Sequence, residues 1–201
     1  MTRGTQVHSG ELTREAILNE ARRIFIAGGD TALSMRQVAQ ACEISLGHLQ
    51  HFFPTRGTLV AAMLRRTVDD YMGAYLRFLT TLEFDARGRM TTVLRYLIED
   101  SRNPDTSSFF IELWSLARRD AAAREILQAT YRRNCTALSP FLAAVRSDLT
   151  PERIRVLTLQ VVAFLDGIIV YWYSERPSDA DFAALADAAL STVQQMIAAA
   201  T

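Results

Sequence analysis

The sequence predicts an all-α fold of about nine helices, and three observations support this prediction. Apolar residues recur at helical spacing along most of the 201 residues. Alternating β-branched segments, which would indicate strands, are rare. Serine, threonine or aspartate precedes most of the periodic segments, where an N-cap residue is expected. The chain is also long enough to bury a substantial core in one or two domains.

Charge is balanced over the whole chain but not along it. The 22 basic residues, all of them arginine, equal the 22 acidic residues in number. Residues 1–66 contain eight arginines and five acids, a surplus of three positive charges. Residues 67–201 contain fourteen arginines and seventeen acids, a surplus of three negative charges. A basic N-terminal part permits contact with nucleic acid without proving it.

The sequence does not predict export or insertion into a membrane. The longest apolar run, from Val161 to Tyr173, is broken by an Asp-Gly pair and is too short to span a bilayer. No signal-peptide pattern opens the chain, so we expect a cytoplasmic protein without a membrane partner. The two cysteines, Cys42 and Cys135, are expected to be reduced core residues.

The first ten residues lack periodicity and are expected to form a mobile arm, residues 1–10. Thr13 is a favourable N-cap for a first helix that runs to about Ala27. Gly28 and Gly29 are expected to end this helix. Its apolar residues fall on one face: Ile17, Leu18, Ala21, Ile24 and Phe25.

Residues 34–54, SMRQVAQACEISLGHLQHFFP, have the form of two short helices joined by a tight turn. Ser34 and Gln37 make a capping-box pattern at the first helix, and Ser45 is the expected N-cap of the second. Small Ala39 lies where the two helices should cross closely. This arrangement is typical of a helix-turn-helix, whose second helix enters the major groove of DNA.

The second helix of this pair exposes one face. On it, Gln50 has the amide geometry that pairs with adenine, and Leu46 suits a thymine methyl group. Gly47 permits a close backbone approach, and His48 and His51 can donate to phosphate or guanine. An ordinary solvated helix face is the alternative interpretation. The two histidines match half of a metal site, but no third ligand is near in sequence, so no metal is expected.

Six further helices are expected after Pro54. Thr150 followed by Pro151 combines an N-cap with a proline at the first helical position, and Ser178 caps the last helix. Pro140 lies within an expected helix and should kink it. The expected ranges are about 55–82, 87–102, 105–119, 120–147, 151–175 and 178–199.

Residues 12–60 resemble the DNA-binding domain of the TetR family of bacterial transcriptional regulators. The resemblance rests on Val38-Ala39, Ile44-Ser45, Gly47, Leu49, His51-Phe52-Phe53-Pro54 and Leu59. It implies a homodimer that binds a double-stranded DNA operator of approximate two-fold symmetry. It also implies a helix-turn-helix DNA-binding domain at residues 11–55 and a regulatory domain, for ligand binding and dimerisation, at residues 56–201. By position it implies DNA contacts at Ser34, Arg36, Ser45, Leu46, Gly47, His48, Gln50, His51 and Arg56.

Three residues depart from the family pattern. Glu43 replaces the usual glycine of the turn. Leu46 replaces a frequent lysine and so removes a phosphate contact. Gln50 replaces a frequent tyrosine and exchanges its contact for a possible adenine contact. The operator sequence therefore does not follow from the resemblance.

The last two helices are expected to form the dimer interface. The helix at about 151–175 is apolar nearly all round, so it should be buried on most sides. Paired with the last helix of each subunit, it would give a four-helix interface, with the core of a monomer as the alternative. The interface candidates are Leu157, Val161, Leu165, Ile168, Trp172, Leu185, Val193 and Met196.

A small-molecule site is expected between the middle helices, although each candidate residue would also suit an ordinary core. Asp166 is unusual because it lies in an apolar helix, where it could meet a ligand, an arginine or a partner subunit. The apolar and aromatic character of the set favours a hydrophobic or aromatic effector. The candidates are Phe110, Trp114, Tyr131, Cys135, Phe164 and Asp166.

The expected function is a repressor that leaves its operator when a small molecule binds. An effector-independent regulator and an activator are the alternatives. An enzyme is not expected, because the sequence contains no Ser/His/acid set, metal cluster or phosphate-binding loop. No cofactor is expected either.

Overall fold

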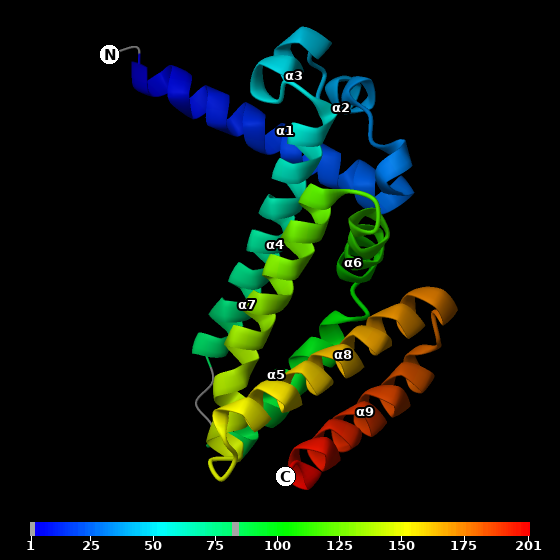
Figure 1. Ribbon diagram of the computed structural model, residues 1–201. Coiled ribbons are helices and arrows are strands. Elements are labelled where there is room, and N and C mark those ends of the chain that lie inside the picture. Colours follow the sequence, from blue (N-terminus) through cyan, green and yellow to red (C-terminus); the bar gives the residue numbers. More distant parts are fainter. Residues whose placement is uncertain (1–2, 82–84) are drawn as a thin grey trace. The chain divides into compact units, whose positions relative to one another are not determined.

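The computed structural model describes residues 3–81 and 85–201, with side chains from residue 10 onward. Within these residues the chain forms nine α-helices and no β-strand, which confirms the predicted all-α fold (Figure 1). The helices are α1 (Arg3–Ala32), α2 (Met35–Ala41), α3 (Leu46–Phe52), α4 (Arg56–Thr80), α5 (Ala86–Asp100), α6 (Pro104–Ala117), α7 (Ala121–Val145), α8 (Pro151–Glu175) and α9 (Asp179–Ala199).

Helix α1 begins earlier than the sequence predicted. Its first residue is Arg3, so residues 3–10, expected to be an irregular arm, are helical. Residues 1 and 2, also part of the expected arm, lie outside the described residues. A helix that has formed is extended at little cost, even by residues without an apolar face. Apolar periodicity therefore predicted the part of α1 that packs on the core, but it did not predict the N-terminal extension of this helix.

Helix α1 also continues beyond the glycine pair that was expected to end it. It reaches Ala32 across a kink at Gly29, whose φ of 69° and ψ of −171° are not helical. The glycine pair therefore interrupts the regular helix without ending it.

The remaining helices follow the prediction closely. Helix α8 has the predicted bounds. Thr150 and Ser178 are the N-caps of α8 and α9, and each accepts a hydrogen bond from the backbone N–H three residues on, at 3.4 and 3.2 Å. Pro140 lies inside α7, which continues past it to Val145.

The chain divides into two compact units. The first contains the residues up to Tyr71 together with Glu112–Leu127. The second contains Met72–Ile111 and Gln128–Thr201. The unit around the helix-turn-helix thus includes more of the chain than the predicted DNA-binding domain of residues 11–55.

The first unit has an apolar core to which its N-terminal helices contribute. Phe25 of α1 and Leu49 of α3 are fully buried in it. Cys42, Ile44 and Phe52, which were expected on the apolar face, are only half-buried. The part of α4 that joins this core explains why the unit extends past residue 55. The other buried apolar residues of the four helices and their connections are Ile17, Leu18, Ala21, Leu33, Val38, Ala39, Phe53, Leu59, Val60, Met63, Leu64 and Val68.

In the second unit, α5, α8 and α9 pack on one another, and α8 and α9 run side by side (Figure 1). Ala186 and Ala189 are buried on α9, where their small side chains permit close helix packing. Just after α5, the Arg102 guanidinium lies 5.1 Å from the ring centre of Phe182 and donates a 2.8 Å hydrogen bond to Asp179. This arginine therefore ties the end of α5 to the start of α9.

Much of the apolar surface of α8 is not covered by other described residues of the chain. Its most apolar 18-residue window has a mean hydropathy of 1.8, and 28% of that window is buried. By length and composition both α8 and α9 would fit a bilayer, which corrects the expectation from the interrupted apolar run. Both helices also pack a face against their neighbours in the second unit. The apolar side chains exposed on α8 are Val156, Leu159, Val170 and Tyr171.

Candidate nucleic-acid interface

Two serine N-caps fix the starts of α2 and α3, as the sequence predicted. Ser34 Oγ accepts a 3.2 Å hydrogen bond from the Gln37 N–H and donates a 2.7 Å bond to Gln37 Oε1. Ser45 Oγ accepts a 3.1 Å bond from the His48 N–H. Both hydroxyl groups are therefore engaged in orienting the helices before any DNA is bound.

The turn between α2 and α3 places a glutamate in a conformation that favours glycine. Glu43 has a φ of 54°, in the left-handed region. Its N–H donates to the Gln40 carbonyl at 3.1 Å, and the Ile44 N–H donates to the Ala39 carbonyl at 3.0 Å. These bonds hold the tight turn, so the glutamate adopts the conformation that the turn requires at a cost of roughly 1 kcal/mol.

The candidate recognition surface is the exposed face of α3. Gly47, His48, Gln50 and His51 are exposed on this short helix, and Leu46 is half-buried. The structure therefore brings together the five residues of α3 that the sequence singled out. The opposite face carries the buried Leu49, which fixes the helix on the core of the first unit.

Gly47 is a residue that the fold itself does not require. A Cβ at this position would meet no atom within 4 Å, and its φ is not positive. A glycine inside a helix costs about 1 kcal/mol relative to alanine. Neither packing nor backbone conformation therefore requires glycine at this position.

Two histidines flank a half-exposed phenylalanine at the end of α3. The His48 and Phe52 rings stack with centroids 5.5 Å apart, and His51 meets Phe52 edge-on at 5.6 Å. These contacts restrict the imidazole rings to the surface of α3. Within the described residues, no group of three or more His, Cys, Asp or Glu is placed to hold a metal ion.

Arg36 and Arg56, the two arginines predicted to contact phosphate, have different environments. Arg36 on α2 is exposed and makes no ion pair within the part of the chain that the structure describes. Arg56 donates to the Leu33 carbonyl at 2.7 Å and, at 2.5 Å each, to the carbonyl and Oδ1 of Asp30. The Arg36 side chain is therefore open to solvent, whereas Arg56 holds the segment that follows the α1 kink.

Asp30 connects three segments of the first unit. Its second carboxylate oxygen lies 3.4 Å from Nη2 of Arg119, in the turn between α6 and α7. Beside it, Glu112 of α6 covers Gly29, where a Cβ would overlap the glutamate carboxylate. Because that close approach coincides with a positive φ, glycine is needed at this kink. The α1 kink, the start of α4 and the end of α6 therefore meet around one aspartate.

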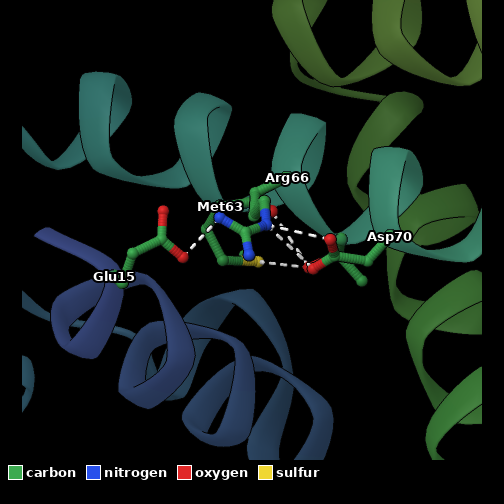
Figure 2. Close-up of polar contacts among 5 residues, drawn as sticks. Glu15, Met63, Arg66 and Asp70 are labelled. Atoms are coloured by element: carbon green, nitrogen blue, oxygen red, sulfur yellow. Dashed lines mark hydrogen bonds and ion pairs between the residues drawn. The ribbon is translucent and has the colours of Figure 1, made fainter. Parts of the chain in front are cut away.

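Figure 2 shows a second link between α1 and α4, centred on Arg66. Its Nε lies 2.9 Å from both carboxylate oxygens of Asp70, and its Nη1 donates to Glu15 of α1. Hydrogen bonding to Asp70 is the main cause that raises the pKa of Arg66. Partly exposed ion pairs of this kind contribute about 0–1 kcal/mol each. Their role here is to orient α1 on α4 more than to stabilise the fold.

Among the predicted effector residues, Tyr131 and Asp166 are in direct contact. The Tyr131 hydroxyl donates a 2.6 Å hydrogen bond to Asp166 Oδ2. Burial raises the pKa of Asp166 to about 6, and the hydrogen bond from Tyr131 opposes that shift. Burial, followed by the nearby charge of Asp166, raises the pKa of Cys135. Tyrosine, cysteine and aspartate thus form a polar group between α7 and α8.

The other predicted effector residues are more dispersed. Phe110 is buried and meets Phe109 edge-on at 5.5 Å, and Phe164 is half-buried. Trp114 belongs to the first unit, whereas the other five candidates belong to the second. A surface pocket of about 210 Å³ includes only Cys135 from the predicted set, and its walls are Cys135, Thr136, Ser139, Arg155, Thr158 and Leu159.

The predicted dimer residues differ in exposure. Leu157, Val161, Ile168 and Val193 are buried within the second unit. Leu165, Trp172, Leu185 and Met196 are half-buried. A helix that is apolar nearly all round has no periodicity to separate its inner and outer faces. The structure, and not the periodicity, therefore identifies the apolar residues of α8 that are exposed.

These features define a helix-turn-helix DNA-binding protein with a large C-terminal helical part. The profile of bacterial regulatory proteins of the tetR family matches residues 17–63. That of the C-terminal domain of BetI-type transcriptional repressors matches residues 86–197, more than half of the chain. The protein belongs to the TetR family of transcriptional regulators.

Several relatives are named as helix-turn-helix transcriptional regulators. One from Xanthobacter autotrophicus, from the dhlA 5′ region, is 26% identical over 78% of this chain and 77% of its own length. BetI of Burkholderia thailandensis is 23% identical over 79% of this chain and 80% of its own. UidR of Escherichia coli K12 is 30% identical over 48% of this chain and 56% of its own.

Solved structures support the same fold. A regulator from Pseudomonas aeruginosa PAO1 superposes with a TM-score of 0.79 at 15% identity, over 95% of this chain and 93% of that one. A regulator from Saccharomonospora viridis, solved in complex with choline, has a TM-score of 0.75 at 18% identity over 94% and 97% of the two chains. At these identities the likeness concerns the fold alone.

Proposed function

We propose that this regulator is a cytoplasmic repressor that binds a palindromic operator as a homodimer and releases it when a small molecule binds. The exposed face of α3, with its unexplained Gly47, is the observation that carries the DNA-binding part of this proposal. In a helix-turn-helix the second helix enters the major groove. Here that helix is α3, and its polar side chains extend away from the core of the first unit.

Base and phosphate contacts are divided among the exposed residues. Gln50 is proposed to pair with adenine, since its side-chain amide offers both a donor and an acceptor. Arg36 is proposed to bind phosphate, which adds affinity without sequence preference. The open position of Gly47 lets the α3 backbone approach the DNA, while Ser34 and Ser45 act mainly as caps.

Dimerisation is proposed through the exposed apolar face of α8. An isologous dimer places two identical α3 helices on one duplex, which matches a palindromic operator with half-sites about 34–36 Å apart. The exposed Leu159 and Tyr171 are the residues most in need of an apolar partner.

The effector is proposed to be a small molecule that binds in the second unit. A structural neighbour binds choline, and the BetI-type profile covers most of the second unit of this chain. The contact between Tyr131 and Asp166 supplies a polar group in an otherwise apolar region. The proposed effector would add a hydrophobic or aromatic body beside this polar contact.

DNA binding is tested by fluorescence anisotropy with fragments of the region upstream of the gene. Arg36→Ala is expected to weaken binding to all fragments alike and to lower the salt dependence, because one phosphate contact is lost. Gln50→Ala is expected to change the preference at one base pair. Arg89→Ala, which removes an exposed arginine from α5 in the second unit, serves as the charge-matched control. If Arg36→Ala and Gln50→Ala both bind every fragment like the parent protein, the proposed DNA contacts of α2 and α3 are wrong.

Repression and effector release are tested separately. A reporter gene under the protein's own promoter should be less active with the protein than without it, and an activator would give the opposite result. A compound that raises the melting temperature should also weaken operator binding if the two events are coupled. An effector-independent regulator would keep its operator in the presence of every compound that binds it.

A further inference from the structure

Among the described residues of the second unit, two buried side-chain polar atoms lack a hydrogen-bond partner. The Oη atom of Tyr75 on α4 is one, and Oδ2 of Asp100 at the end of α5 is the other. Tyr75 is 2% exposed, so its hydroxyl is removed from bulk solvent. A buried polar group without a partner costs about 1–3 kcal/mol. Two such groups on adjacent segments of one unit therefore need an explanation.

Aromatic rings connect these two atoms. The Tyr96 ring stacks on Phe78 with centroids 4.1 Å apart and an interplanar angle of 15°. On α4 one turn earlier, Tyr75 lies parallel to Tyr96 at 6.1 Å and 17°. Asp100 follows Tyr96 by four residues on α5, on the same side of the helix. The carboxylate and the buried hydroxyl thus both lie beside the aromatic cluster of Tyr75, Phe78 and Tyr96.

Burial shifts the pKa values of Tyr75, Tyr96 and Asp100, and neighbours within this group shift those of the two tyrosines further. Burial raises the pKa of Asp100, and a hydrogen bond from Thr106 lowers it by less. Burial and then the charge of Asp100 raise the pKa of Tyr96, and the charge of Arg77 lowers it by less. Burial and then the neighbouring Tyr96 raise the pKa of Tyr75. The free carboxylate oxygen would be stabilised by a positive charge that also donates a hydrogen bond.

The chemistry of the cluster selects the ligand class. A protonated amine can donate to Asp100 Oδ2, and aromatic faces attract cations. A quaternary ammonium ion has the charge but no N–H donor, and an alcohol has a donor but no charge. A carboxylate ligand would be repelled by Asp100. A polar acceptor on the ligand would pair with the Tyr75 hydroxyl.

We propose that Tyr75, Tyr96 and Asp100 form a binding site for a small organic amine in its protonated form, with Phe78 completing the aromatic surface. The site shares no residue with the effector candidates around Tyr131. It stands apart from the proposed regulatory function, because amine binding is a property of the protein without DNA.

The test compares three ligands of similar shape by isothermal titration calorimetry and thermal melting. Phenethylamine supplies both charge and N–H donors, 2-phenylethanol lacks the charge, and trimethyl(2-phenylethyl)ammonium lacks the donors. We expect phenethylamine to bind at least about tenfold more tightly than either analogue. Equal binding of all three would overturn the amine class.

Two conservative variants locate the site. Asp100→Asn should lower phenethylamine affinity by about tenfold or more, because the charge partner is lost. Tyr75→Phe should leave phenethylamine affinity nearly unchanged, because this ligand has no acceptor for the hydroxyl, while the unliganded variant melts at the same or a higher temperature, since an unpaired hydroxyl has been removed. A merely structural role for the hydroxyl would give the opposite change in melting temperature. Asp187→Asn, at an exposed carboxylate of α9, is the matched control and should bind like the parent.

The result that would overturn the proposal is specific. If phenethylamine produces no heat and no melting shift at millimolar concentration, buried water alone satisfies the two polar atoms. That outcome would leave DNA binding through α3 unaffected, since the anisotropy experiment measures it independently.

Discussion

At the scale of single residues, three positions show a conflict between side chain and environment. Glu43 has a left-handed backbone, Gly47 leaves open space on a helix, and Asp166 is a carboxyl group in an apolar helix. Each carries a local free-energy cost, which the Tyr131 hydrogen bond offsets in part at Asp166. Residues that break local rules in this way are often tied to function, and each conflict can be measured.

Glu43→Gly is expected to stabilise the protein by up to about 1 kcal/mol, because glycine adopts a positive φ without a steric penalty. Urea denaturation measures the change. Glu125→Gly, at an exposed position within α7, is the control and should destabilise by about 1 kcal/mol. A loss of stability from both substitutions would mean that the Glu43 side chain has an important contact of its own.

Gly47→Ala is expected to leave stability unchanged or to raise it by up to about 1 kcal/mol, since the new methyl group meets no neighbour and alanine favours helices. DNA affinity is expected to fall by about tenfold, equivalent to about 1.4 kcal/mol, because the methyl group would lie between α3 and the duplex. Denaturation and anisotropy on the same sample distinguish the two effects. Undiminished DNA binding would show that the duplex does not approach this position.

Asp166 predicts a pH dependence of stability. Its carboxyl has a pKa of about 6 in the folded protein, against about 4 in an unfolded chain. Between these values the folded state holds a proton that the unfolded state has lost, so stability falls as pH rises from about 4 to 6. Asp166→Asn should therefore be more stable than the parent at pH 7.5, by about 1–3 kcal/mol, and similar to it near pH 4.

Denaturation curves at several pH values measure this difference. Asp187→Asn, at an exposed carboxylate, should show no such trend. A stability difference that is constant across the pH range would mean that Asp166 titrates normally in the folded protein.

At the scale of helices, the segment after the α1 kink is held by arginines from two other elements. Arg56 at the start of α4 and Arg119 after α6 both reach Asp30, whose side chain is 14% exposed. A shift of the α6–α7 turn would therefore change the environment of the kink and of the first turn of α4. Within the first unit, this network fixes how α4 begins relative to the helix-turn-helix.

Arg56→Ala is expected to lower the free energy of unfolding by about 1–3 kcal/mol, because the Asp30 carboxylate and two carbonyl groups lose their donor. Arg36→Ala, which removes an exposed arginine, should leave stability within about 0.5 kcal/mol of the parent. Urea denaturation compares the two variants. If neither changes stability, Arg56 acts only as a phosphate ligand, as the family resemblance implied.

At the scale of the whole molecule, the exposed apolar face of α8 predicts self-association. Leu159→Arg is expected to convert a dimer to a monomer, since Leu159 is 48% exposed and a charge there would be buried on dimerisation. Leu12→Arg, at a leucine that is 59% exposed on α1, is the matched control and should remain dimeric. Analytical ultracentrifugation measures both masses. A parent protein that sediments as a monomer would contradict the homodimer directly.

Periodicity and capping residues predicted the helices well, because the signals are local. Each N-cap bonds to a residue three positions along the chain, so the serine caps of α2, α3 and α9 can be recognised from a short segment of sequence. The same holds for the proline at the start of α8. Glu43 was recognised as unusual from the family pattern alone. The exposed face of α3 could be predicted from the sequence, because a short amphipathic helix packs its apolar face on the core and leaves the opposite face exposed.

The sequence by itself determined the all-α fold, the family and the residues of the candidate recognition helix, since these depend on spacing along the chain. Only the tertiary structure decided which apolar residues of α8 are internal, which arginine is free, and which polar atoms lack a partner. Such properties depend on contacts between residues far apart in sequence. Arg56 and Asp30 are 26 positions apart, and Tyr75 meets Tyr96 from another helix. Local patterns do not encode such pairs, because burial and hydrogen bonding are set by the packing of whole helices.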